Sequence, residues 1–156
     1  MQKRNVLKDF GIVTVLSVVV AILLNMLLLL INLPQYSERY QEAVKILYAP
    51  SLVEQILYSG ILIPILEELI FRGLLFRLLR KWVAFPWAMI MSAVVFGAYH
   101  GNLVQFVYAG ICGMVFAFLY EKYDSVLVPV WSHMTMNLSS LILTHIGVFE
   151  WMLQKC

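Results

Sequence analysis

An apolar run near the start of the sequence constrains the fold most. Residues 10–33 contain no charged side chain, and about 20 apolar residues are enough to cross the hydrocarbon core of a bilayer as a helix. The 156-residue chain is 62% hydrophobic and only 13% charged, whereas soluble domains carry about a quarter charged residues. The sequence therefore predicts an integral membrane protein and excludes a soluble enzyme or a disordered chain.

Further stretches have the length and hydrophobicity of membrane helices. They cover residues 51–79, 85–100, 103–120 and 126–146. Between the first two spans, Ser37 is placed to cap a short amphipathic helix, which we expect to lie at the membrane surface. No stretch has the alternating pattern of a β-strand. The predicted fold is all-α, a polytopic membrane helix bundle of about five transmembrane helices.

Basic residues lie before the first span and between the second and third spans. Cytoplasmic loops of membrane proteins are enriched in such residues, so we expect a multi-pass protein of the cell membrane with a cytoplasmic N-terminus. The first apolar run is too long for a signal peptide and no small-residue cleavage site follows it, which favours a retained span. The basic residues concerned are Lys3, Arg4, Lys8, Arg77, Arg80 and Lys81.

The remaining composition argues against several other kinds of site. The formal net charge is +2 and there is no basic block, so we expect no nucleic-acid partner. Cys112 and Cys156 have neither metal-ligand nor disulfide spacing.

Three charged residues interrupt the second span, where charge is costly and commonly functional. Arg72 follows Glu68 by four residues, the spacing at which an acid and a base meet on one helix face. Glu67 points about 100° away from Glu68. It is left without a local partner, and such a buried carboxylate suits a general base. The alternative is that all three residues only hold neighbouring helices together.

Two other spans carry histidine. His100 closes the third span one turn after Phe96, and His133 and Asn137 share one face of the fifth span. Imidazole and amide groups can donate hydrogen bonds to a developing oxyanion. The alternatives are a capping or interfacial role for His100 and interhelical hydrogen bonding for His133 and Asn137. From the rise of about 1.5 Å per residue, the polar groups of the three spans occupy one layer, and we expect them to converge.

These residues resemble the three motifs of the CPBP family, which comprises type II CAAX prenyl endopeptidases and bacteriocin-processing or immunity proteins (the Abi family). The matching motifs are Glu67-Glu68-x-x-x-Arg72, Phe96-x-x-x-His100 and His133-x-x-x-Asn137. The resemblance implies intramembrane peptide-bond hydrolysis. It implies that Glu67 and His100 activate a water, that His133 and Asn137 stabilise the oxyanion, and that Glu68, Arg72 and Phe96 support the site or position the substrate.

The resemblance also divides the chain. We expect an N-terminal transmembrane helix with an amphipathic connector over residues 1–50, a four-helix catalytic core over 51–146, and a short C-terminal tail over 147–156. Glu67, His100 and His133 are one candidate zinc site with an open position for water. Because the sequence has no HExxH motif, we favour a metal-free glutamate–histidine pair without a cofactor.

The predicted function is therefore an intramembrane endopeptidase acting on a membrane-associated peptide or protein, of CAAX type or a peptide precursor, in the lipid bilayer. One rival is a non-catalytic immunity or scaffold protein with the same fold. Another is a small proton- or ion-coupled transporter with Glu67 as its carrier site and with Pro64 and Pro129 as helix breaks. The absence of an inverted repeat places the transporter last.

Overall fold

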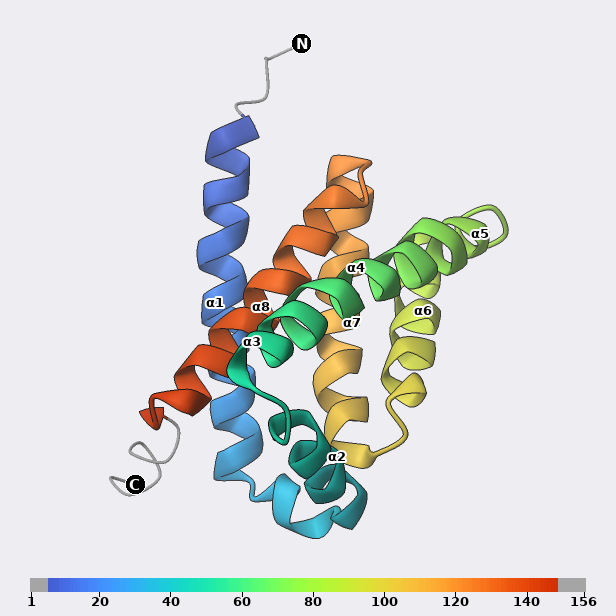
Figure 1. Ribbon diagram of the computed structural model, residues 1–156. Coiled ribbons are helices and arrows are strands. Elements are labelled where there is room, and N and C mark those ends of the chain that lie inside the picture. The colour runs from blue at the N-terminus through green and yellow to red at the C-terminus, as the bar shows by residue number, and fades with distance from the viewer. Residues whose placement is uncertain (1–5, 149–156) are drawn as a thin grey trace.

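The computed structural model describes residues 6–148 and shows an all-α fold, as predicted (Figure 1). The first predicted span forms α1 (Val6–Leu30). The third, fourth and fifth form α6 (Phe85–Tyr99), α7 (Leu103–Tyr123) and α8 (Leu127–His145). Lys3, Arg4 and Cys156 lie outside the described residues, as does most of the predicted C-terminal tail.

Two of the described helices are long and apolar enough to cross a membrane by themselves. These are α1 over Lys8–Leu30 and α7 over Leu103–Tyr123. The apolar helix α6 is shorter. α8 contains His133 and Asn137. The helices that carry the polar motifs do not meet this test of length and hydrophobicity. The five-span arrangement therefore stays a prediction.

The second predicted span is helical throughout, but its hydrogen-bond pattern changes along its length. Three α-helical stretches alternate with two π-helical stretches, in which the hydrogen bonds run from i to i+5. In chain order these are α3 (Leu52–Gln55), π-helix Ile56–Leu62, α4 (Ile63–Glu68), π-helix Leu69–Phe76 and α5 (Arg77–Leu79). π-helical stretches are frequent at functional sites, and here they flank the turn that carries Glu67 and Glu68.

The helices pack in pairs that the α3–α5 helix crosses (Figure 1). α1 lies along α8, where the hydroxyls of Ser17 and Ser132 share a buried hydrogen bond of 2.7 Å. α6 lies along α7. Their close approach depends on Gly97, where an added Cβ would lie 2.6 Å from the carbonyl oxygen of Phe106. The α3–α5 helix contacts α6, α7 and α8, so its middle is buried between the two pairs.

The connector after α1 contains the predicted amphipathic helix. A short 3₁₀-helix (Leu33–Tyr36) leads into α2 (Glu38–Tyr48). The Ser37 hydroxyl caps α2 by accepting a hydrogen bond from the Tyr40 backbone N–H, as the sequence predicts. α2 packs against α3 and α7.

Two details differ from the sequence-based expectations. The sequence predicts that the fourth span ends at residue 120, but α7 continues through Tyr123 and turns at Asp124, which has a φ of 49°. The extension is favoured by two hydrogen bonds from Arg80 to the Glu121 carboxylate, of 3.0 and 2.7 Å. Pro64 and Pro129 each lie in the first turn of an α-helical stretch, where a missing N–H is tolerated. Neither proline ends a helix, so the transporter hypothesis loses its proposed helix breaks.

Gly97→Ala is expected to destabilise the bundle, because its Cβ would collide with the backbone of α7. Overpacking of this kind costs about 1–3 kcal/mol, which lowers the melting temperature by several degrees in a chain of this size. The measurement is thermal unfolding of the purified protein in detergent.

Gly11→Ala is the matched control. Nothing lies within 4 Å of a Cβ at Gly11, and alanine is the better helix former. The control is expected to melt at or above the wild-type temperature. Equal melting temperatures for the two variants would contradict the close α6–α7 contact.

Candidate active site

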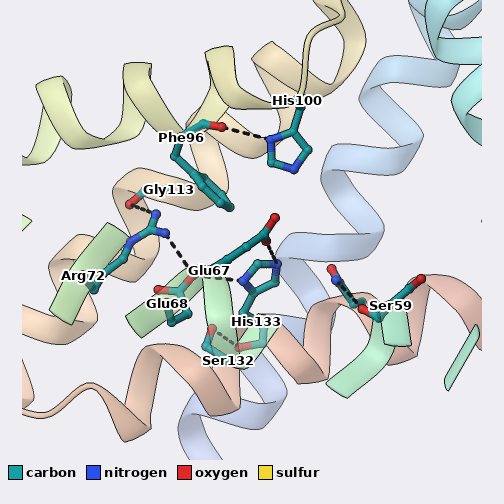
Figure 2. A network of polar contacts seen from close by, with 11 residues as sticks. Ser59, Glu67, Glu68, Arg72, Phe96, His100, Gly113, Ser132 and His133 are labelled. Carbon is teal, nitrogen blue, oxygen red and sulfur yellow. Dashed lines mark hydrogen bonds and ion pairs between the residues drawn. The ribbon is translucent and has the colours of Figure 1, made fainter. Parts of the chain in front are cut away.

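A buried ion pair lies at the centre of the bundle (Figure 2). Glu68 and Arg72 are both fully buried, and Arg72 Nη1 donates to Glu68 Oε1 over 2.9 Å. The ion pair that the i,i+4 spacing predicts is therefore present. The guanidinium carbon lies 4.4 Å from the ring centroid of Phe96 and 5.2 Å from that of Phe116. These aromatic faces add cation–π attraction to the ion pair.

The other end of the guanidinium is held by α7. Arg72 Nη2 donates to the Gly113 carbonyl oxygen over 3.0 Å. A Cβ at Gly113 would lie 3.0 Å from this same nitrogen and 3.2 Å from the Ala93 Cα. The absence of a side chain at Gly113 thus lets α7 pack closely against Ala93 of α6. The structure shows that it also gives Arg72 access to a backbone carbonyl.

His133 shares a carboxylate oxygen with Arg72. Its Nδ1 lies 2.9 Å from Glu68 Oε1. Because an ionised carboxylate only accepts, Nδ1 carries the hydrogen, which leaves Nε2 for other chemistry. The ring of Phe116 stacks on the imidazole at 4.7 Å. Glu68 and Phe116 together fix the position and tautomer of His133.

His100 is oriented in a similar way by its own helix. Its Nδ1 lies 2.9 Å from the Phe96 carbonyl oxygen, which accepts the hydrogen. The Phe96 ring meets the imidazole edge-on at 5.1 Å. His100 is the C-terminal cap residue of α6, so the capping alternative is correct for its backbone. Its Nε2 is nevertheless available to a neighbouring group.

Glu67 is placed differently from the adjacent Glu68. It is 7% exposed and makes no hydrogen bond within the described part of the chain. Its Oε2 lies 3.8 Å from His133 Nε2. Figure 2 shows this carboxylate between the two imidazoles. The predicted split between a paired Glu68 and a locally unpaired Glu67 is present in the structure.

A cavity of about 750 Å³ is lined by Glu67 and by both histidines. Glu68 and Arg72 do not line this cavity. The motif residues that line it come from three helices, as the expected convergence requires, and they are Glu67, Phe96, His100, His133 and Asn137. In the second-span motif, Glu67 thus faces the cavity, and the Glu68–Arg72 ion pair lies behind the cavity wall.

Asn137 links α8 to the π-helical stretch of the second span. Its Nδ2 donates to the Ser59 carbonyl oxygen over 2.9 Å. One of its two amide hydrogens therefore makes an interhelical hydrogen bond, which is the alternative role considered for this residue. A primary amide has a second hydrogen to donate, and Asn137 also lines the cavity.

Within the described part of the chain, no group of three His, Cys, Asp or Glu side chains is arranged to hold a metal ion.

Sequence reasoning missed two parts of the surroundings. The first is His145 of α8, whose Nε2 lies 3.0 Å from Oε1 of Gln55 in α3. The cavity wall also includes Asn25 of α1 and one side of α2, both outside the predicted catalytic core. The signal for Asn25 is an amide inside an otherwise apolar span.

Fold and site together define a helical membrane protein with a buried glutamate–histidine centre. A family model described as "Type II CAAX prenyl endopeptidase Rce1-like" matches residues 49–139. The chain belongs to this family, which confirms the resemblance seen in its motifs. All three motifs lie within the matched residues, whereas the whole of α1 and of α2 lies outside them.

The chain is also similar to a Bacillus subtilis (strain 168) protein named "Putative membrane peptidase YdiL". The two are 37% identical over 101 residues, which is 65% of this chain and 41% of the relative. The match thus covers less than half the length of that relative. No solved structure matches the chain.

Arg72→Met is expected to destabilise the protein strongly. Methionine keeps much of the side-chain volume but leaves the Glu68 carboxylate buried without its cation, and breaking a buried pair in this way costs about 3–5 kcal/mol. The double variant Glu68→Gln/Arg72→Met is expected to recover part of the loss. Thermal unfolding in detergent measures both effects.

Arg80→Met is the control, because Arg80 forms a pair of similar length with Glu121 at the surface. Exposed pairs contribute little, so only a small change is expected. A melting temperature for Arg72→Met as high as that of Arg80→Met would show that the buried pair is not needed for stability.

Proposed function

We propose that this protein is an intramembrane endopeptidase that hydrolyses a peptide bond of a membrane-associated peptide or protein in its cavity. The observation that carries the proposal is the position of Glu67. It is the one charged residue of its motif that reaches the cavity, and it does so beside two imidazoles whose Nδ1 atoms are already bound. Membership of the Rce1-like family supports the same reaction class.

Glu67 acts as the general base in this proposal. A water beside its carboxylate gives up a proton to Glu67 while the water oxygen attacks the carbonyl carbon of the substrate. The Phe96 carbonyl holds Nδ1 of His100, so the His100 Nε2 faces the reacting groups and helps to orient the water. The proton then passes to the departing nitrogen as the C–N bond breaks, which yields a carboxylate and an amine.

His133 and Asn137 stabilise the oxyanion. Their donors are Nε2 of a protonated His133 and the second amide hydrogen of Asn137, both at the cavity wall. The Glu68 carboxylate accepts the other imidazole hydrogen, which is on Nδ1. Removing a single donor of this kind typically lowers kcat by about 10²–10³.

Glu68, Arg72 and Phe96 are positioning residues in this scheme. Arg72 fixes the Glu68 carboxylate, Glu68 fixes His133, and the Phe96 carbonyl fixes His100. The Phe96 ring also packs against both imidazoles, with centroids 5.1 Å from His100 and 5.9 Å from His133. Both candidate catalytic histidines thus depend on groups that do not react.

We further infer that all five predicted spans cross the membrane, with the N-terminus in the cytoplasm. The helices outside the span criterion carry large apolar side chains on the outer surface of the bundle, such as Leu66, Leu74 and Val94, which are 59%, 66% and 50% exposed. Such a surface suits lipid and is unfavourable in water. Residues 51–146 form the catalytic core in this scheme, 1–50 the helix and connector before it, and 147–156 the tail.

Glu67→Gln is expected to abolish cleavage, because the amide keeps the shape of the side chain but cannot take a proton. The measurement compares, by mass spectrometry, the peptides cut in membranes that contain the wild-type or variant protein at equal abundance. Glu54→Gln is the control, since Glu54 lies at the same cavity and glutamine also serves at its capping position. Processing by Glu67→Gln at the wild-type level would overturn the mechanism.

A chelator gives a second result in the same assay. Since the described residues form no metal-binding group, cleavage by the wild-type protein is expected to continue in EDTA. Loss of cleavage in EDTA, with recovery on adding zinc, would contradict the metal-free mechanism.

The orientation is tested with single cysteines in a background that lacks Cys112 and Cys156. Tyr36 is 76% exposed and Trp82 is 82% exposed, and the proposed topology places them on opposite sides of the membrane. A membrane-impermeant maleimide is expected to label Tyr36→Cys in intact cells and Trp82→Cys only after permeabilisation. The opposite labelling pattern would show that the N-terminus is not cytoplasmic. Equal labelling of the two variants in intact cells would show that Tyr36 and Trp82 do not lie on opposite sides of the membrane.

A further inference from the structure

The cavity continues well beyond the candidate catalytic residues along one face of α8. His133, Asn137, Ser140 and Thr144 follow one another at helical spacing, and all four line it. Ser140 is seven residues after His133, or about 10 Å along the axis at 1.5 Å per residue. An extended peptide covers this distance with about three residues.

A cluster of three neutral polar side chains lies at this level. Asn25 Nδ2 of α1 donates to Ser140 Oγ over 3.1 Å and to Tyr108 Oη over 3.4 Å. The Ala21 carbonyl oxygen of the same helix lies 2.8 Å from this nitrogen, so its two hydrogens are shared among the three acceptors. Asn25 Oδ1 accepts no hydrogen bond within the described part of the chain. All three side chains of the cluster line the cavity, where Asn25 Oδ1 is available as an acceptor, while the Tyr108 hydroxyl also contacts Ser140.

The charge of the cavity limits what this cluster can bind. Among the described residues that line it, none is lysine or arginine, and the carboxylates are those of Glu54 and Glu67. Arg72 lies behind the wall with its guanidinium bound to Glu68 and to the Gly113 carbonyl. A carboxylate buried without a cation loses hydration that neutral donors do not replace, whereas an amide needs only hydrogen bonds.

We propose that Asn25, Tyr108 and Ser140 form a subsite for an uncharged peptide group about three residues from the scissile bond. The cavity then selects a stretch of chain that continues past this subsite, and it disfavours a segment that ends there in a free carboxylate. The inference rests on the proposed peptidase function and names its substrate class. Asn25 and Ser140 lie outside the residues that match the family model, whereas Tyr108 lies within them, so the subsite combines residues from both parts of the chain.

The test measures binding of two synthetic peptides to the purified wild-type protein in detergent. The probes are N-acetyl-Leu-Leu-Val-Leu-Ala-Leu-amide and the same peptide with a free C-terminal carboxylate, titrated by calorimetry at neutral pH. The amide is expected to bind at least about tenfold more tightly, which corresponds to about 1.4 kcal/mol.

Three variants separate this effect from a change in folding. Tyr108→Phe removes one hydroxyl and is expected to reduce the preference for the amide to less than threefold. Ser140→Lys adds a cation and is expected to reverse the preference, which a merely unstable protein would not do. Ser17→Ala removes a buried hydrogen bond between α1 and α8 away from the cavity and is expected to keep the wild-type ratio.

Equal binding of the two peptides by the wild type, tighter binding of the free acid, or no binding of either would each overturn the subsite. None of these results would affect the proposed hydrolysis, since the Glu67→Gln comparison scores cleavage in membranes. Conversely, retained cleavage by Glu67→Gln would contradict the proposed role of Glu67. The peptide-binding result would still stand.

Discussion

The buried ion pair between Glu68 and Arg72 is the interaction on which the rest of the site depends. It places two charges at the centre of a bundle where a single unpaired charge would be costly. One oxygen of Glu68 accepts from both Arg72 and His133, and the guanidinium also holds α7 through the Gly113 carbonyl. The pair therefore ties α7 and α8 to the second-span helix and aims one imidazole at the cavity.

The cavity chemistry follows from this arrangement. Because Arg72 is bound to Glu68, the neighbouring Glu67 is left to face the cavity, where its Oε2 lies 3.8 Å from His133 Nε2. The same use of Arg72 leaves the described cavity wall without lysine or arginine. One ion pair behind the wall thus leaves a carboxylate facing the cavity and no lysine or arginine on the described part of the wall.

The local parts of this arrangement could be predicted from the sequence, and the parts that depend on helix placement could not. The Glu68–Arg72 pair and the Ser37 cap follow from spacing along one helix. The sharing of Glu68 with His133 joins residues 65 positions apart, and the bond from Asn137 to Ser59 joins residues 78 apart. The π-helical stretches and the contribution of Asn25 to the cavity also depend on packing between helices, which one-dimensional patterns do not contain.

The central claim is that two adjacent glutamates have different roles, and comparing the thermal unfolding of Glu67→Gln and Glu68→Gln in detergent tests it most directly. Glu67 makes no hydrogen bond among the described residues, so its glutamine variant is expected to melt within about 2 °C of the wild type or above it. Glu68→Gln leaves Arg72 buried without its counter-charge and is expected to melt far lower. If Glu67→Gln melted as low as Glu68→Gln, both glutamates would be structural and the account would be wrong.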